Sequence, residues 1–255
     1  MKPGVILFVM IAGSLTACQW GTPGDSKPAI TKDTLQYSYK VIKRKAPDCG
    51  NKPDSDCVVA QIRYPLFLNQ KKLNDTISYR LITQFSILDK PDNNLEHLAD
   101  QFLKAGKDFR LNSNSFIIRE DSSILLAQVS GYRFLGGARG YYLVSFINWN
   151  TKAQREIALS DILKDGHVQD LNSIAEKIFR KQENLAGDTP LKGYLFENGK
   201  FSLNNNFLIT PIGLRFLYNQ YEIKPYPAAE ASLLIPYSQI ESLLRPNTVV
   251  TQYYK

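Results

Sequence analysis

The chain has 255 residues with a formal net charge of +7 at pH 7; 44% of its residues are hydrophobic and 22% are charged. This composition supports a packed core and excludes a wholly disordered protein. Three cysteines and two histidines are too few for a structural zinc cluster. After the N-terminal region no apolar run of about 18 residues occurs, which excludes a polytopic membrane protein.

The first 17 residues have the pattern of a signal peptide. Lys2 precedes a short apolar run at 5–13, and Leu15-Thr16-Ala17-Cys18 follows. The run is too short to span a membrane. Small residues before a cysteine resemble the lipobox of bacterial lipoproteins. This resemblance implies cleavage before Cys18, attachment of acyl chains such as palmitate to Cys18, and a lipid anchor in the cell envelope, facing the periplasm or the exterior. The alternative is an ordinary secretory signal peptide.

Residues 18–33 predict a flexible tether, because glycine, proline and small polar residues dominate this segment. The folded region is expected to begin near Thr34.

Cys49 and Cys57 remain as an even pair, as expected in an oxidising compartment. The seven residues between them favour turns, and the flanking segments 35–43 and 58–64 alternate in apolarity as strands do. We therefore predict a hairpin closed by a Cys49–Cys57 disulfide. A metal-binding or redox-active pair is the alternative.

The rest of the chain predicts an α+β fold, with a mostly antiparallel sheet and three long helices packed on it. Apolar residues at helical spacing predict helices at 72–88, 94–109 and 168–183, with a short helical turn at 160–163 and a closing helix at 238–244. Beyond the hairpin, the expected strands are 116–118, 123–134, 141–149, 156–159, 207–210, 214–218 and 231–235.

The search for catalytic and metal-binding patterns returns none of the common hydrolase or nucleotide-binding motifs. His97 and His167 are 70 residues apart and are interpreted as surface histidines. Glu120-Asp121 is interpreted as a turn. We predict no catalytic residue, no metal and no cofactor. A serine triad that uses His167 remains an alternative, since triads assemble from distant residues.

Three stretches carry a resemblance to a family of extracytoplasmic bacterial domains of unknown function. They are GGARG (136–140) with FINW (146–149) and IALSDIL (157–163), then FLITPIGL (207–214) leading to YEIKPY (221–226), and ASLLIPYSQI (231–240). The family is similar to the extracellular part of RsiV-type anti-sigma factors, which sense lysozyme, and to the N-terminal region of PdaC-type peptidoglycan deacetylases. The resemblance implies an N-terminal part at 34–135 and a C-terminal part at 136–255. The family usually has histidine at position 139, where this chain has Arg139.

The candidate ligand-binding residues are Arg139 and a group of tyrosines in a proline-containing segment: Tyr218, Tyr221, Tyr226 and Tyr237. Tyrosine offers a rigid apolar ring and a hydroxyl, which suits recognition of sugars or proteins. The alternative is that these rings fill the core.

Two functions follow from these observations. The first is a lipid-anchored binding or sensing module, not an enzyme, whose partners are the membrane and either peptidoglycan or a protein; nucleic acid is excluded by the compartment. The alternative is an envelope hydrolase whose active site no motif marks. The basic charge favours acidic wall polymers or anionic headgroups as partners, although solvated strand and helix faces also explain it.

Overall fold

The computed structural model describes residues 35–54, 57–106, 109–137, 139–187, 189–225 and 230–254. These residues belong to one compact unit, residues 33–255. The predicted signal peptide, the tether and Cys18 lie outside the described residues. Within the described ranges, no helix is both long and apolar enough to cross a membrane.

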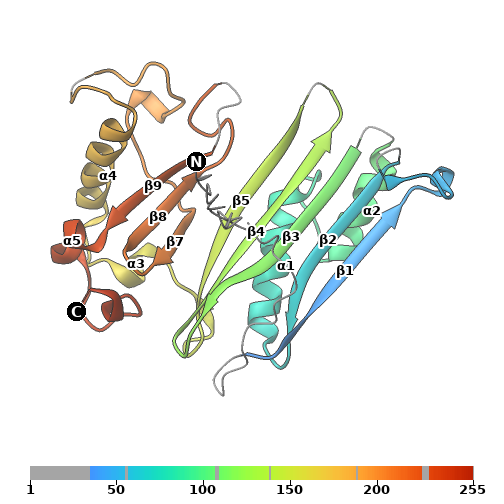
Figure 1. Cartoon of the computed structure of the whole chain (residues 1–255), viewed down its shortest axis with the longest axis horizontal. Helices are drawn as coiled ribbons and strands as arrows, with labels where there is room; N and C mark the ends of the chain where they lie inside the picture. Colours follow the sequence, from blue (N-terminus) through green and yellow to red (C-terminus); the bar gives the residue numbers. More distant parts are fainter. Residues whose placement is uncertain are drawn as a thin grey trace, which may run out of the picture. The chain divides into compact units, whose positions relative to one another are not determined.

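The larger of two sheets has six strands that lie side by side in chain order (Figure 1). Every neighbouring pair is antiparallel except β2 and β3, which are parallel. A parallel pair needs a crossover connection, and two helices form it here. The strands are β1 (Tyr37–Lys45), β2 (Val59–Phe67), β3 (Phe109–Glu120), β4 (Ile124–Leu135), β5 (Gly140–Asn150) and β6 (Arg155–Glu156).

The crossover helices α1 (Lys71–Phe85) and α2 (Leu95–Ala105) cover one face of this sheet (Figure 1). Helix α2 begins after Asn94, whose side chain accepts a hydrogen bond from the backbone N–H of Glu96 at 2.8 Å. The odd-numbered residues of β4 and β5 face the helices, since side chains alternate along a strand. Five of them are buried in the helix-facing core: Leu125, Ala127, Val129, Ile147 and Trp149.

The even-numbered residues of β4 and β5 enter a second core on the opposite face. They are Ile124, Leu126, Val144 and Phe146, and they pack against the C-terminal part of the chain. That part contains a three-stranded antiparallel sheet and α4, which contacts β9. Its elements are α3 (Leu159–Ile162), α4 (Val168–Gln182), β7 (Phe207–Thr210), β8 (Gly213–Tyr218), β9 (Ala231–Pro236) and α5 (Tyr237–Ile240). The 3₁₀ turns are η1 (Pro47–Cys49), η3 (Glu197–Gly199), η4 (Glu241–Leu243) and η5 (Thr251–Tyr253).

Asparagine side chains join the two sheets. Asn148 on β5 is 2% exposed. It donates to the Phe207 carbonyl at 2.7 Å and accepts from the Ile209 N–H at 2.9 Å, so it binds β7 as a neighbouring strand would. Asn206 and Asn219 accept hydrogen bonds from the Phe146 and Val144 N–H groups at 3.0 and 2.7 Å. These contacts satisfy backbone groups on the part of β5 that β6 does not cover.

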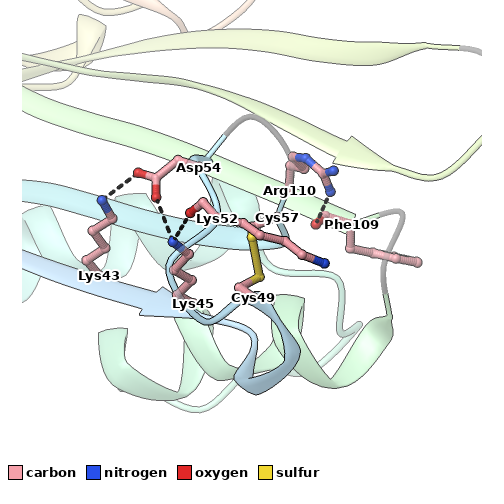
Figure 2. Close-up of a disulfide and its surroundings, with 8 residues drawn as sticks. All are labelled: Lys43, Lys45, Cys49, Lys52, Asp54, Cys57, Phe109 and Arg110. Carbon is pink, nitrogen blue, oxygen red and sulfur yellow. Dashed lines mark hydrogen bonds and ion pairs between the residues drawn. A yellow bond between two sulfur atoms is a disulfide. The ribbon is translucent and has the colours of Figure 1, made fainter.

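A disulfide joins Cys49 to Cys57 at the end of the β1–β2 hairpin, with 5.6 Å between the Cα atoms (Figure 2). Both cysteines are buried. Asp54 in the enclosed loop accepts from Lys43 Nζ at 2.5 Å and lies 3.7 Å from Lys45 Nζ. The predicted pairing of the cysteines is therefore confirmed, and lysines of β1 hold the loop that the disulfide closes.

The α+β class and the mostly antiparallel sheet are confirmed, but the expected arrangement of three long helices on one sheet is wrong. Helices α1, α2 and α4 have 15, 11 and 15 residues, and α5 continues into η4 as a shorter fourth helical segment. Helices α1 and α2 pack on the six-stranded sheet, whereas α4 packs on β9 of the three-stranded sheet. The predicted division at residue 136 falls in the turn between β4 and β5, which pair along their length.

Candidate functional site

Two segments that the sequence singled out meet at the end of the β4–β5 hairpin. The Arg139 guanidinium donates a hydrogen bond to the Tyr221 hydroxyl at 2.6 Å, and its carbon lies 5.7 Å from the centre of the Tyr221 ring. The Tyr141 ring packs edge-on against Tyr221, with 5.8 Å between ring centres. Arg139 and Tyr221 are 82 residues apart in the chain, so tertiary folding alone brings them together.

Tyr221 has an uncommon backbone conformation, with φ at +63°. An aromatic side chain rarely adopts this left-handed region because its Cβ crowds the backbone. A tight turn holds it there: the Asn219 N–H donates to the Glu222 carboxylate at 2.7 Å, and the Glu222 N–H donates to the Asn219 carbonyl at 3.1 Å. Asn219 also binds β5, which attaches the turn to the sheet.

Tyr132 and Tyr142 are direct cross-strand partners on β4 and β5. Their side chains are 42% and 41% exposed. A Cβ built on Gly140 would lie only 2.0 Å from the Tyr132 hydroxyl and 2.1 Å from the adjacent ring carbon. The Tyr132 ring therefore lies against the Gly140 backbone, a position that only glycine leaves open.

A row of polar and aromatic side chains continues from these tyrosines across the sheet. The strand register pairs Tyr142 with Tyr132, Tyr132 with Asn112, and Asn112 with Gln61. All four lie on the face opposite α1 and α2, because their neighbours in sequence face the helix-side core. We call Gln61, Asn112, Tyr132 and Tyr142 the exposed ladder. Four adjacent strands span about 14 Å at the usual strand spacing.

The row beside the exposed ladder adds a guanidinium and an amide. Arg63 donates to Asn114 at 3.3 Å, and its guanidinium carbon lies 3.5 Å from the centre of the Tyr39 ring. This surface thus combines aromatic rings with amides and an arginine, which are the groups that stack on sugar rings and hydrogen-bond their hydroxyls.

Two of the candidate tyrosines lie in the core. Tyr218 and Tyr237 are each 2% exposed, and burial raises the pKa of both hydroxyls. Tyr218 donates to the Ser202 carbonyl at 2.7 Å, and Tyr237 stacks on Tyr253 with 6.2 Å between ring centres. Tyr226 lies outside the described residues. Of the candidates, the structure therefore brings together Arg139 and Tyr221.

The other polar residues considered from the sequence have local partners. His97 bonds to Asp92, and His167 bonds to Asp170 at 2.7 Å. The Asp121 carboxylate accepts from the backbone N–H groups of the β3–β4 turn. Among the described residues, no group of three or more His, Cys, Asp or Glu side chains is placed to hold a metal ion.

Sequence reasoning missed the exposed ladder. Asn112 lies in a segment that we assigned to no strand, and Tyr132 and Tyr142 fall in predicted strands that we did not examine for exposed rings. No apolar alternation marks the position of Asn112, because the core-facing residues that follow it, Ser113 and Ser115, are polar.

Comparison with known proteins identifies relatives of the same fold. Residues 160–238 match a family model described as a protein of unknown function, DUF3298. The chain is similar to the solved structure of a DUF3298 family protein from Pseudomonas aeruginosa PAO1 (TM-score 0.71, 21% identity, covering 84% of this chain and 96% of that one). It is also similar to a DUF3298 family member from Bacteroides fragilis NCTC 9343 (TM-score 0.68, 19% identity, covering 86% of this chain and 97% of that one). Among curated proteins none matches. The family resemblance predicted from the sequence is therefore confirmed: residues 160–238 resemble DUF3298, and the two DUF3298 structures share the fold of the chain.

Proposed function

We propose that this protein is a lipid-anchored binding module of the bacterial cell envelope, and that the exposed ladder binds cell-wall glycan. One observation carries the proposal: the strand register lines up two exposed tyrosines with an asparagine and a glutamine on the sheet face opposite α1 and α2. Tyrosine rings stack on the apolar faces of sugars, and amide side chains both donate to and accept from hydroxyls.

The location of the ladder supports an extended ligand rather than a single small molecule. Its four residues come from four adjacent strands, so a chain molecule lying across the strands would contact each in turn. Arg139 and Tyr221 contact each other at the end of the β4–β5 hairpin, where Tyr221 packs on Tyr141, and they are not counted as part of the ladder. The lipobox at Cys18 supports a place in the envelope, where the glycan is abundant.

The test is sedimentation of the full-length protein with purified, insoluble peptidoglycan. Replacing Tyr132 and Tyr142 together by alanine should lower the retained fraction at least about tenfold, because aromatic anchors dominate such interfaces. Tyr79→Ala is the matched control, since Tyr79 is 61% exposed on α1, which packs on the opposite face of the sheet. Equal retention of the double variant and the control would contradict a role for the ladder.

The anchor is tested separately in cells. Cys18→Ser should move the protein from the membrane fraction to the soluble fraction, because Cys18 would carry the acyl chains. Mass spectrometry of the N-terminal peptide identifies the modification directly. An unmodified Cys18 in the native protein would contradict lipidation and leave the ladder unaffected.

A further inference from the structure

A cavity lies between the C-terminal end of α4 and strand β9, away from the exposed ladder. Its volume is about 340 Å³, within the range of sites for small molecules. Its lining combines apolar and polar side chains: Phe179, Gln182, Glu183, Tyr218, Lys224, Glu230, Ala231, Ser232 and Leu233. No ladder residue is among them, so this cavity is independent of the proposed glycan surface.

The only cation in the lining is already paired. Lys224 Nζ lies 3.0 and 2.8 Å from the two carboxylate oxygens of Glu183, and the Tyr194 hydroxyl donates to the same carboxylate at 2.6 Å. The side chains of Lys224 and Glu183 are only 19% and 24% exposed. Burial alone would raise the pKa of the Glu183 carboxyl, but the hydrogen bonds from Lys224 and Tyr194 lower it below its ordinary value. Glu183 is thus ionised at neutral pH, and it neutralises Lys224.

The second carboxylate, Glu230, has no such partner. Within the described ranges, no hydrogen bond or ion pair reaches its side chain, and burial raises the pKa of its carboxyl. The lining therefore holds two carboxylates against one ammonium, which leaves one negative charge uncompensated. A partly buried charge without a partner is unfavourable, and a cationic ligand would relieve that cost.

We propose that this cavity binds a small ligand that carries a protonated amine, with Glu230 as its counter-ion. The ammonium group would donate charge-assisted hydrogen bonds to the Glu230 carboxylate. Gln182 and Ser232 offer neutral hydrogen-bonding groups, and Phe179 and Leu233 offer an apolar wall for the body of the ligand. An anionic ligand is disfavoured, because the Lys224 charge is already satisfied by Glu183.

Glucosamine and glucose are a matched pair of probes, since they differ at one carbon by an ammonium group in place of a hydroxyl. Binding of each to the purified full-length protein is measured by calorimetry or by chemical-shift titration. We expect glucosamine to bind at least about tenfold more tightly than glucose, as one charge-assisted contact gains about that factor. Equal affinities, or binding of neither sugar, would overturn the proposal.

Two variants test whether the ligand binds in the cavity. Glu230→Gln keeps the size of the side chain and should remove the preference for glucosamine, whereas Glu241→Gln, an exposed residue of η4 outside the cavity, should keep it. Ser232→Tyr fills the cavity from an exposed position of β9 without changing its charge, and it should abolish binding of glucosamine. Thermal unfolding of each variant establishes that it is folded. Retained preference in Glu230→Gln, or retained binding in Ser232→Tyr, would show that the sugar binds elsewhere.

Discussion

Tyr221 has a partly buried side chain that contacts Arg139 and a backbone conformation that costs free energy. The left-handed region is unfavourable by about 1–2 kcal/mol for a residue with a Cβ, whereas glycine adopts it freely. Its φ of +63° is fixed by the Asn219–Glu222 turn, and its hydroxyl meets Arg139. Backbone strain of this kind tends to persist where a residue has a function. Because Tyr221 contacts Arg139, a candidate ligand-binding residue, its strain points to a functional reason for having tyrosine at this position.

This strain predicts a difference between two substitutions that both remove the ring. Tyr221→Gly should have a free energy of unfolding about 1 kcal/mol higher than Tyr221→Ala, because only glycine relieves the backbone. Chemical denaturation of both variants measures the difference. Equal stabilities would mean that the turn relaxes when the ring is lost.

The Glu120 carboxyl should make the free energy of unfolding depend on pH with a sign opposite to that expected for most surface acids. Burial raises the pKa of its carboxyl, although the carboxylate accepts a hydrogen bond from the Leu35 N–H at 2.7 Å. The folded state therefore binds the proton more tightly than the unfolded chain. Above the folded-state pKa, the charged Glu120 carboxylate lowers the free energy of unfolding. This loss disappears as the pH falls through the folded-state pKa toward the unfolded-state pKa of about 4.3.

Glu120→Gln should consequently unfold at a slightly higher temperature than the native protein at pH 7, since glutamine keeps an acceptor for the Leu35 N–H and removes the charge. Near pH 4 the two melting temperatures should converge. Thermal unfolding across this pH range gives the comparison, and a variant that is less stable at pH 7 would show that the charge strengthens the hydrogen bond more than burial penalises it.

At the scale of elements, Asn148 is the polar link between the two sheets. Its amide pairs with the Phe207 carbonyl and the Ile209 N–H, both on β7.

Asn148→Leu would leave these two buried backbone groups unpaired, which should lower the free energy of unfolding by about 2–4 kcal/mol. Asn150→Ala, at the partly exposed end of β5, is the control and should cost less than about 1 kcal/mol, because water can replace its side-chain bonds to Lys152 and Ala153. Denaturation of both variants measures the two losses. Similar losses in both would mean that the link between the sheets contributes little.

Strand β3 illustrates why some elements could not be predicted. The sequence indicated a strand only at 116–118, whereas β3 extends from Phe109 to Glu120. Ser113 and Ser115 occupy its core-facing positions and are fully buried, so the apolar alternation that identifies a strand is interrupted. Small residues are needed there because Gly131 on β4 approaches closely: a Cβ on Gly131 would lie 2.5 Å from the Asn112 carbonyl oxygen. This requirement for small residues comes from the neighbouring strand β4, so the sequence of β3 alone does not reveal it.

For the molecule as a whole, the charge predicts weak binding to strongly basic lysozyme, a partner suggested by the similarity to RsiV-type sensors. The chain carries +7 at pH 7, so the two proteins repel each other at long range. An acidic patch at the start of α2 could overcome this repulsion. The patch would consist of Asp89, Asp92, Glu96 and Asp100. Three of these acids already have partners, however: Glu96 and Asp100 pair with Arg44, and Asp92 bonds to His97.

Calorimetry with lysozyme at 0.15 M salt should therefore give a Kd weaker than about 1 μM, and lowering the salt should weaken binding further because repulsion is screened less. A Kd below that value, or tighter binding at low salt, would indicate complementary patches and restore a lysozyme-sensing role.

The sequence by itself determined the α+β class, the disulfide and the family resemblance, because each depends on spacing within a short segment. Apolar residues at Leu73, Ile77 and Leu81 predict α1 whatever lies beside it. Tertiary structure alone decided which tyrosines are exposed. Tyr218 and Tyr221 are three residues apart, yet one fills the core and the other meets Arg139. Strand register and the packing of α4 on a second sheet are contacts between distant segments, and no local pattern encodes them.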